Sequence, residues 1–527
     1  MAQRTSARPM ASTADHPPKV DFVVEQQLDL TTAPYVADHE LYPQRAGWPV
    51  AADRHPIIPL TMEIELVRLA LEAKVAGWKV IEVSAVSAYR WLPVAQPRQI
   101  TLRFASGPDG VVDAQIEGFF RAQLTLARAY PHAPQASAPA LHDRQPARID
   151  AARLYGEGWM FHGPAYQGIV ALDGVGADGV DVSIRTPTGL GGLVDNMGQA
   201  AAYWFQEQES GSLAMPIGLD RLRLFSDAPL AGSLFTCRSR IRSVDDNDGI
   251  FDIWLDDAHG RSQILVEGWR TRRYPFSREA LKRLRQPHLL GVSQILEDGV
   301  ALFEDVYDTA VARDMLARVY LSAPELAQYD ALPPRRRRQW LNGRCAAKDA
   351  VLNWLRGSGR GGVYPKELRI ENDASGCPRI AANVTDAAPV HLHLSITHKG
   401  KLAAAMVGEA PVGVDVEAIE PRDEGFAALV ASPSELALAS DGDVDAAVTR
   451  AWVAKEVAAK AAQTGLGGDA KAWTIQSRAG SALTVNGHQV RTRRLEGYVL
   501  GWSAPGAAPP TGPKAARGDH ADQNTHA

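Results

Sequence analysis

The chain has 527 residues, and at about 100–200 residues per domain this length predicts several domains rather than one. Hydrophobic residues make up 45% and charged residues 22%, an ordinary globular composition that excludes general disorder and fibrous repeats. The net charge of −5 provides no global basic field, so neither nucleic acid nor a membrane surface is an expected partner.

The cysteines and the lack of long apolar segments indicate the cellular location. Cys237, Cys345 and Cys377 lie far apart and show no paired spacing typical of a zinc site or a disulfide framework. The sequence contains neither the apolar core of a signal peptide nor the roughly 18 apolar residues of a transmembrane helix. We therefore predict a soluble, cytoplasmic protein.

The first predicted domain covers 21–275, after a polar segment, 1–20, that we expect to be disordered. Helical patterns at 60–74 and 193–206 are each followed by alternating strand patterns. Between these two copies, a Pro- and Ala-rich stretch at 131–150 has no periodicity and predicts an inner linker. The sequence therefore predicts two copies of a helix wrapped by an antiparallel sheet.

The second predicted domain covers 301–503, after a linker at 276–300 and before a tail at 504–527 that is poor in large apolar side chains. Its mixed helix and strand patterns contain a short echo, SAPELA at 322–327 and SPSELA at 432–437, each followed by a helical segment with lysines. We therefore expect an α+β protein whose second domain is a pseudo-twofold α/β unit.

The segment GVDVE predicts a strand that buries Val414 and Val416 and presents Asp415 and Glu417 on its other face. Two acids on one face repel each other, and a hard cation such as Mg²⁺ would relieve that repulsion. The alternative is a solvated edge strand with its charges outward.

Three further segments carry candidate residues. The predicted Ala-rich helix 449–467 places Trp452, Glu456 and Lys460 on one face, with Lys455 beside them. Glu456 suits a third metal ligand or a base, and the two lysines suit phosphate binding. The alternative is an ordinary surface helix. His398 ends a strand before a turn, where it could bind a phosphate or be structural, and Arg344 lies one helical turn before Lys348.

Together these segments resemble the Sfp-type 4′-phosphopantetheinyl transferases over roughly 300–505, through LSAPELAQYDALP, NGRCAAKDAV, ASGCPRI, LSITHKG, GVDVE and WVAKEVAAKA in that order. The resemblance implies transfer of phosphopantetheine from CoA to a serine of an acyl carrier protein, with release of adenosine 3′,5′-bisphosphate. One departure is Cys377, which stands where the family often has a CoA-contacting lysine, so that affinity for CoA is expected to be lower.

The same resemblance implies roles for seven residues of the second domain. Asp415, Glu417 and Glu456 would be Mg²⁺ ligands, and Glu456 would also activate the serine. Lys455 and Lys460 would lie near the CoA phosphates and the reaction centre, and Arg344 and His398 would contact CoA at its 3′-phosphate.

In the first domain, His39 follows a short predicted strand, and Asp195 and Gln199 lie one turn apart near the start of a helix. A histidine base facing an acid is what elimination of water from a 3-hydroxyacyl thioester requires. Taken alone, His39 could be a loop histidine and Asp195 a carboxylate favoured by the helix dipole.

The surrounding sequence looks like the double hot-dog dehydratase domain of polyketide synthases over about 21–275, through DHELYP, PIIP, LYGEGWMFHGPAYQGI, DNMGQ and MPIGLDRLRLF. By that resemblance His39 is the base, Asp195 the proton donor and Gln199 its support, while Tyr155, Gly163 and Pro164 match a structural segment of the site. His39 lies about twice the usual distance before Pro59, which makes His55 the competing candidate.

The sequence thus predicts a polyketide or polyunsaturated-fatty-acid synthase type dehydratase fused to its own phosphopantetheinyl transferase, acting on an acyl carrier protein with CoA, Mg²⁺ and 3-hydroxyacyl thioesters. A homodimer through the dehydratase domain is a further hypothesis. Two rivals stay open: a catalytically silent hot-dog module that only binds or docks the carrier, and a wholly non-catalytic scaffold.

Overall fold

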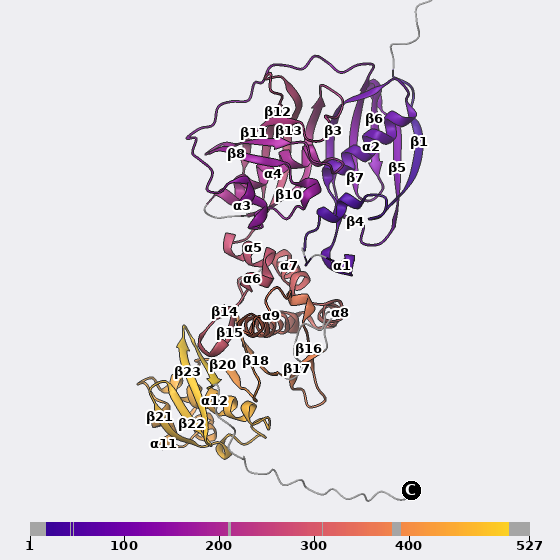
Figure 1. Ribbon diagram of the computed structural model, residues 1–527. Coiled ribbons are helices and arrows are strands. Elements are labelled where there is room, and N and C mark those ends of the chain that lie inside the picture. The colour runs from indigo at the N-terminus through magenta and orange to yellow at the C-terminus, as the bar shows by residue number, and fades with distance from the viewer. Residues whose placement is uncertain are drawn as a thin grey trace, which may run out of the picture. The chain divides into compact units, whose positions relative to one another are not determined.

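The structure is a computed structural model that describes residues 17–42, 44–45, 47–208, 212–307, 309–381 and 392–504. The predicted tail at 504–527, apart from Ala504, and the first 16 residues of the predicted tail at 1–20 lie outside the described residues. The chain divides into two compact units between Gln286 and Pro287 (Figure 1). No described helix combines the length and apolarity needed to cross a membrane.

An 11-stranded antiparallel sheet dominates the first unit. In spatial order its strands are β1 (Asp21–Leu28), β5 (Arg98–Ser106), β6 (Val111–Ile116), β7 (Phe120–Ala127), β3 (Lys79–Ala88), β10 (Ser212–Leu224), β13 (Ser262–Pro275), β12 (Asp248–Asp256), β11 (Leu234–Val244), β9 (Gly179–Arg185) and β8 (Ile169–Gly176). Alternation in β7 buries Phe120, Ala122, Leu124 and Leu126.

Each half of this sheet carries one long helix, which Figure 1 shows as α2 and α4. Helix α2 (Leu60–Lys74) packs on β3, β6 and β7, and α4 (Gly192–Glu207) packs on β8 to β12. Both helices match the predicted patterns. In α2, Ile64, Val67 and Leu71 are buried, whereas Leu69 is 42% exposed. The pairing of β3 with β10 joins the halves into a double hot-dog arrangement.

Smaller elements of this unit surround the helix starts. They are the paired strands β2 (Ile57–Ile58) and β4 (Leu92–Pro93), the helices α1 (Ala51–Arg54), α3 (Ala151–Gly156) and α5 (Arg278–Arg285), and three 3-10 helices, η1 (Pro34–Asp38), η2 (Pro108–Gly110) and η3 (Pro164–Tyr166). Across the expected inner linker, 131–150, the only strand contacts among described residues are two isolated bridges, at Gln135 and Gln145.

The segment 276–300, expected to be a linker, is structured. It contains α5, α6 (Pro287–Leu290), β14 (Gln294–Ile295) and the 3-10 helix η4 (Glu297–Gly299). Leu281 and Leu284 of α5 are buried, because this amphipathic helix turns its apolar face inward, while its arginines and lysine are only partly buried.

The second unit contains two antiparallel sheets, each covered by a long helix. The first sheet runs β14, β15 (Ala301–Glu304), β19 (Leu402–Gly408), β18 (His393–Lys399), β17 (Pro378–Ala381) and β16 (Arg369–Asn372); the second runs β20 (Val414–Ala418), β24 (Tyr498–Ser503), β23 (His488–Leu495), β22 (Ala482–Val485) and β21 (Ile475–Ala479). The helices are α7 (Ala310–Tyr320), α8 (Ala323–Ala331), α9 (Pro334–Gly357), α10 (Glu424–Val430), α11 (Pro433–Ala439) and α12 (Val444–Ala461); η5 (Pro365–Glu367) and η6 (Ala470–Ala472) are 3-10 helices.

The internal echo is structural as well as sequential, which confirms the pseudo-twofold prediction. Ser322 and Glu325 form a capping box at the start of α8, and Ser432 and Glu435 form the same box at the start of α11. Helix α9 packs on the first sheet and α12 on the second. The two halves meet where β18 contacts β20.

Candidate functional sites

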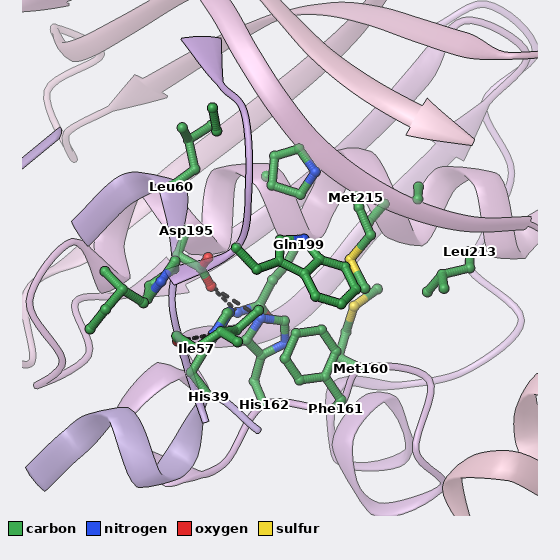
Figure 2. Close-up of a pocket in the computed structure, with 18 of the residues that line it drawn as sticks. His39, Ile57, Leu60, Met160, Phe161, His162, Asp195, Gln199, Leu213 and Met215 are labelled. Carbon is green, nitrogen blue, oxygen red and sulfur yellow. Dashed lines mark hydrogen bonds and ion pairs between the residues drawn. The ribbon is translucent and has the colours of Figure 1, made fainter. Parts of the chain in front are cut away.

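A cavity of about 80 Å³ opens between the two helices of the first unit. Its lining runs along one face of α4, from Asp195 through Gln199 and Ala202 to Gln206. Eleven residues of helix span about 16 Å, so the cavity is a narrow channel suited to an extended chain. Figure 2 shows His39, His162, Asp195 and Gln199 pointing toward one another beside Ile57.

His39 is oriented by the main chain. It follows η1, is 5% exposed, and its Nδ1 lies 2.9 Å from the carbonyl oxygen of Ile57. Because a carbonyl only accepts hydrogen bonds, Nδ1 carries the proton and Nε2 keeps a free lone pair. Burial lowers the pKa of His39 to about 4, so the ring is neutral at physiological pH. His39 therefore has the tautomer and charge of a general base.

The surroundings of Asp195 shift its pKa in the opposite direction, upward. Its Oδ2 accepts a hydrogen bond of 2.8 Å from Nε2 of Gln199 and lies 3.3 Å from Nε2 of His162. Burial raises the pKa of Asp195 to about 7, and the bond from Gln199 only partly opposes this. At neutral pH a large fraction of this carboxyl group is protonated, which suits a general acid.

A polar network holds the face of α4 in place. Tyr155 donates to Oε1 of Gln199 at 3.0 Å, and Nε2 of Gln199 donates to the carbonyl of Tyr166 at 3.0 Å. Asn196 donates to that same carbonyl at 2.9 Å and accepts from Gly168 N–H at 2.8 Å. The predicted support by Gln199 and the predicted proximity of Tyr155 are thus both present in the geometry.

Asp38 ties the segment of His39 to that of His162. Its Oδ2 accepts from Ala165 N–H at 2.8 Å, and its carbonyl accepts from Gly163 N–H at 2.6 Å. Gly163 is required here, because a Cβ at that position would lie 2.5 Å from Oδ1 of Asp38. These bonds bring two segments far apart in sequence to the same end of the cavity.

The sequence interpretation missed His162, although it quoted the segment that contains it. The His162 ring centroid lies 5.1 Å from that of His39, and ligand atoms of His39, His162 and Asp195 all lie within 4.8 Å of one another. Such a trio could also hold a divalent ion. The competing base, His55, does not line the cavity; it ends α1 and packs near Tyr42 and Trp91.

The acids predicted in the second unit come together around Lys460. Asp415 Oδ1 accepts from Lys460 Nζ at 2.7 Å and from Thr397 Oγ1 at 3.0 Å, while its buried Oδ2 has no partner among the described residues. Glu417 lies on the same strand, with Oε2 2.7 Å from Lys399 Nζ. Burial and the charges of Asp415 and Glu417 raise the pKa of Glu456, although Lys460 opposes them.

A pocket of about 370 Å³ adjoins these acids. Arg344 and His398 both line it, as predicted for two residues that share a ligand, and so does Thr397, the partner of Asp415. Arg344 stacks over the Trp340 ring at 4.7 Å, and its buried Nε has no partner among the described residues. Burial and the charge of Lys460 lower the pKa of His398, and Lys460 itself contacts Asp415, which in turn bonds the pocket residue Thr397.

Lys455 does not fit its predicted role at the CoA phosphates. It is fully buried, and its Nζ donates to the carbonyl of Val430 at 2.8 Å and to Oε1 of Glu435 at 2.8 Å. Lys348 occupies the equivalent place in the other half, paired with Glu325. Because a helix advances 100° per residue, Lys455 points into the core when Glu456 points toward Asp415. Its role is structural.

The comparisons with known proteins divide along the same lines as the units. A family model described as the 4′-phosphopantetheinyl transferase superfamily matches residues 411–503, which include Asp415, Glu417, Glu456 and Lys460. A second model, described as the polyketide synthase dehydratase N-terminal domain, matches residues 133–280, which include His162, Asp195 and Gln199.

Curated relatives match the second unit. A holo-[acyl-carrier-protein] synthase of Shouchella clausii is 41% identical over 88 residues, 16% of this chain and 72% of the relative. Another from Streptococcus pyogenes is 30% identical over 108 residues, 20% of this chain and 86% of the relative.

Solved structures match about half of the chain. The dehydratase domain of PpsC from Mycobacterium tuberculosis, in complex with C12:1-CoA, is 19% identical with a TM-score of 0.37, covering 49% of this chain and 100% of that one. The dehydratase domain of a mycocerosic acid synthase-like polyketide synthase is 19% identical with a TM-score of 0.38, covering 50% and 98%.

Proposed function

The chain belongs to the 4′-phosphopantetheinyl transferase superfamily through its C-terminal domain, and from this premise we propose that it transfers 4′-phosphopantetheine from CoA to a serine of an acyl carrier protein. Its N-terminal domain is a double hot-dog dehydratase domain of polyketide synthase type. We propose that this domain eliminates water from 3-hydroxyacyl chains on the same carrier.

Mg²⁺ fits the acids of the transferase site. Among the described residues Asp415 offers a buried oxygen without a partner. Burial, together with the charges of Asp415 and Glu417, raises the pKa of Glu456, and a bound cation would favour the ionised form of these acids. Asp415, Glu417 and Glu456 would hold the ion, which neutralises charge on the pyrophosphate when bound. The carboxylate-rich donor set, without cysteine or histidine, favours a hard cation.

The remaining residues of the transferase site have separate roles in binding CoA and activating the carrier serine. Arg344 and His398 bind CoA phosphate oxygens in the pocket, and Lys460 places a positive charge beside Asp415. Glu456 accepts the proton of the carrier serine, whose oxygen attacks the phosphorus nearer the pantetheine. The bond between this phosphorus and the bridging oxygen of the pyrophosphate breaks, and adenosine 3′,5′-bisphosphate leaves with that oxygen. Positioning and charge neutralisation carry most of such a reaction.

The mass of the carrier protein tests this proposal. The chain incubated with CoA, Mg²⁺ and apo carrier protein should add one phosphopantetheine group, and Asp415→Asn and Glu456→Gln should lose this activity by 100-fold or more while staying folded. Glu420→Gln is the matched control, since Glu420 pairs only with the nearby Arg422 beyond the strand. Modification at the parent rate by either folded site variant would exclude the metal assignment.

The dehydratase proposal depends on one observation: His39 and Asp195 bring ligand atoms within 4.8 Å of each other in one cavity, where burial lowers the pKa of the histidine to about 4 and raises that of the aspartic acid to about 7. Nε2 of His39 removes the α-proton of a 3-hydroxyacyl thioester, and Asp195 delivers its proton to the departing hydroxyl group, so that water leaves and a 2-enoyl thioester forms. Gln199 holds the carboxyl group in position through its 2.8 Å bond.

An assay of 3-hydroxyacyl thioester dehydration distinguishes an active dehydratase domain from a module that only docks the carrier. The absorbance of the enoyl product measures the reaction. His39→Ala and Asp195→Asn should each lower kcat/KM by about 10²–10⁴-fold, whereas His55→Ala should leave it nearly unchanged. If the parent chain binds and modifies its carrier but dehydrates no tested substrate, the silent-module alternative is correct.

We place both activities in polyketide or polyunsaturated-fatty-acid biosynthesis, in the cytoplasm. The fusion supports this context, because one domain prepares the carrier that the other requires. A homodimer through the dehydratase domain is part of the proposal, and sedimentation at micromolar concentration tests it.

A further inference from the structure

The dehydratase cavity contains a second carboxylic acid that the proposed reaction does not use. Glu63, on α2, is 2% exposed and lines the same cavity as His39 and Asp195. Within the part of the chain that the structure describes, no hydrogen bond or ion pair satisfies its carboxyl group. The arginine Arg285, which also lines the cavity, instead donates to main-chain carbonyls of Gly158 and Trp159.

Glu63 enters the cavity near the reacting groups. It is the fourth residue of α2, as Asp195 is the fourth residue of α4. The two first turns abut, since a Cβ on Gly191, the residue before α4, would lie 2.6 Å from the backbone of Thr61 and Met62. Glu63 and Asp195 thus line the cavity from adjoining helix turns, whereas Gln206 lines it near the other end of α4.

The surroundings determine which chemistry Glu63 can recognise. Burial raises the pKa of Glu63 well above its usual range, so the group is an uncharged acid with one donor and an acceptor. The neighbouring lining is largely apolar, including Ile57, Ile58 and Trp269. A plain alkyl chain would displace water from the acid and leave its carboxyl group without a hydrogen-bond partner. A hydroxyl group on the bound chain could accept from the O–H of the Glu63 carboxyl group and donate to its carbonyl oxygen.

We propose that Glu63 is a specificity residue that hydrogen-bonds a second hydroxyl group on the acyl chain, a few bonds beyond the 3-hydroxyl group. The site therefore prefers a chain that is already oxygenated over a fully reduced one. This inference depends on the proposed dehydratase function. Sites built to bind a substrate hydroxyl group discriminate strongly against analogues that lack it, because their own polar groups stay unpaired.

Two thioesters of equal length test the proposal: 3-hydroxyoctanoyl and 3,5-dihydroxyoctanoyl N-acetylcysteamine. The parent chain should favour the dihydroxy substrate in kcat/KM by at least tenfold. Glu63→Leu should reduce this ratio to about one, partly by improving the plain substrate, and Glu63→Gln should keep most of it because the amide still donates and accepts. A parent ratio near one, or an unchanged ratio in a folded Glu63→Leu chain, would overturn the proposal.

A binding measurement tests the Glu63 proposal independently of the proposed dehydratase activity. Calorimetric titration of the Asp195→Asn variant with both thioesters measures affinity without turnover, and adding Glu63→Leu should abolish any preference. If the parent never dehydrates but this preference appears and depends on Glu63, only the catalytic proposal fails. Tighter binding of a 5-amino analogue than of the 5-hydroxyl chain would overturn the Glu63 proposal, since an amine requires an ionised carboxylate.

Discussion

The imidazole of His162 contacts the carboxyl group of Asp195, with Nε2 3.3 Å from Oδ2. Gln199 donates to the same oxygen at 2.8 Å, so both contacts fall on one oxygen of Asp195. Burial lowers the pKa of His162 well below its usual range, which keeps it an uncharged partner. We therefore expect His162 to position Asp195 rather than to act as a second base.

Replacing His162 with Phe should lower kcat of dehydration and leave KM nearly unchanged. The ring stacks on Phe161 with centroids 4.1 Å apart, so Phe preserves the packing and removes only the polar contact. A hydrogen bond between uncharged groups contributes about 0.5–1.5 kcal/mol, which corresponds to a loss of about 2- to 10-fold. His162→Gln should recover part of the rate. Steady-state kinetics that show a raised KM and parent kcat would contradict this role.

A plot of kcat/KM for dehydration against pH should be bell-shaped. Below about pH 4 His39 is protonated and cannot accept the α-proton, and above about pH 7 Asp195 loses the proton it must deliver. The kcat/KM of the parent chain should therefore be highest between these values and fall on both sides. A stopped assay across pH 3.5 to 9 with a non-ionising thioester measures this profile. A rate still rising above pH 8 would contradict the assignment of Asp195 as acid.

Lys455→Met should destabilise the transferase domain without changing the KM for CoA. Removing one partner of a buried ion pair costs about 3–5 kcal/mol, and Glu435 would be left facing the core. Chemical unfolding followed by tryptophan fluorescence measures the loss. Lys348→Met, which breaks the equivalent pair in the other half, is the matched control and should behave alike.

Acid titration gives a second measurement of the same pair. Hydrogen bonds from Lys455 and from the main chain lower the pKa of Glu435 to about 2, against the effect of burial. A lowered pKa in the folded state contributes stability that is present above the normal pKa and is lost as pH falls through the lowered one. The parent domain should therefore lose stability between about pH 4.5 and 2, and the Lys455→Met variant should lose less.

Gly198→Ala should damage the dehydratase through packing. A Cβ at Gly198 would lie 2.3 Å from Cζ2 of Trp269, a fully buried side chain that lines the cavity. Overpacking of this kind costs about 1–3 kcal/mol and would push the indole toward the substrate channel. Thermal unfolding and kcat/KM should both decline. The double variant Gly198→Ala with Trp269→Phe removes the colliding ring atoms and should recover much of the stability.

The sequence by itself determined the elements and most of the site chemistry. Periodicity predicted the helix Leu60–Lys74, because apolar spacing and an opening proline are local signals. The order of motifs indicated both families, since Asp415, Glu417 and Glu456 lie in segments whose residue types and spacing are specific. Alternation placed the two acids of GVDVE on one face, which depends only on strand geometry.

Tertiary structure alone decided which side chains meet and which are buried. Lys455 and Lys460 look alike in sequence, yet one is buried against Glu435 and the other contacts Asp415, because their faces on α12 differ. His162 and Glu63 carried no sequence signal of their own. Glu63 joins the site because the first turns of α2 and α4 abut, and His162 joins it because Asp38 bonds its segment to that of His39. Local sequence spacing does not determine long-range contacts of this kind.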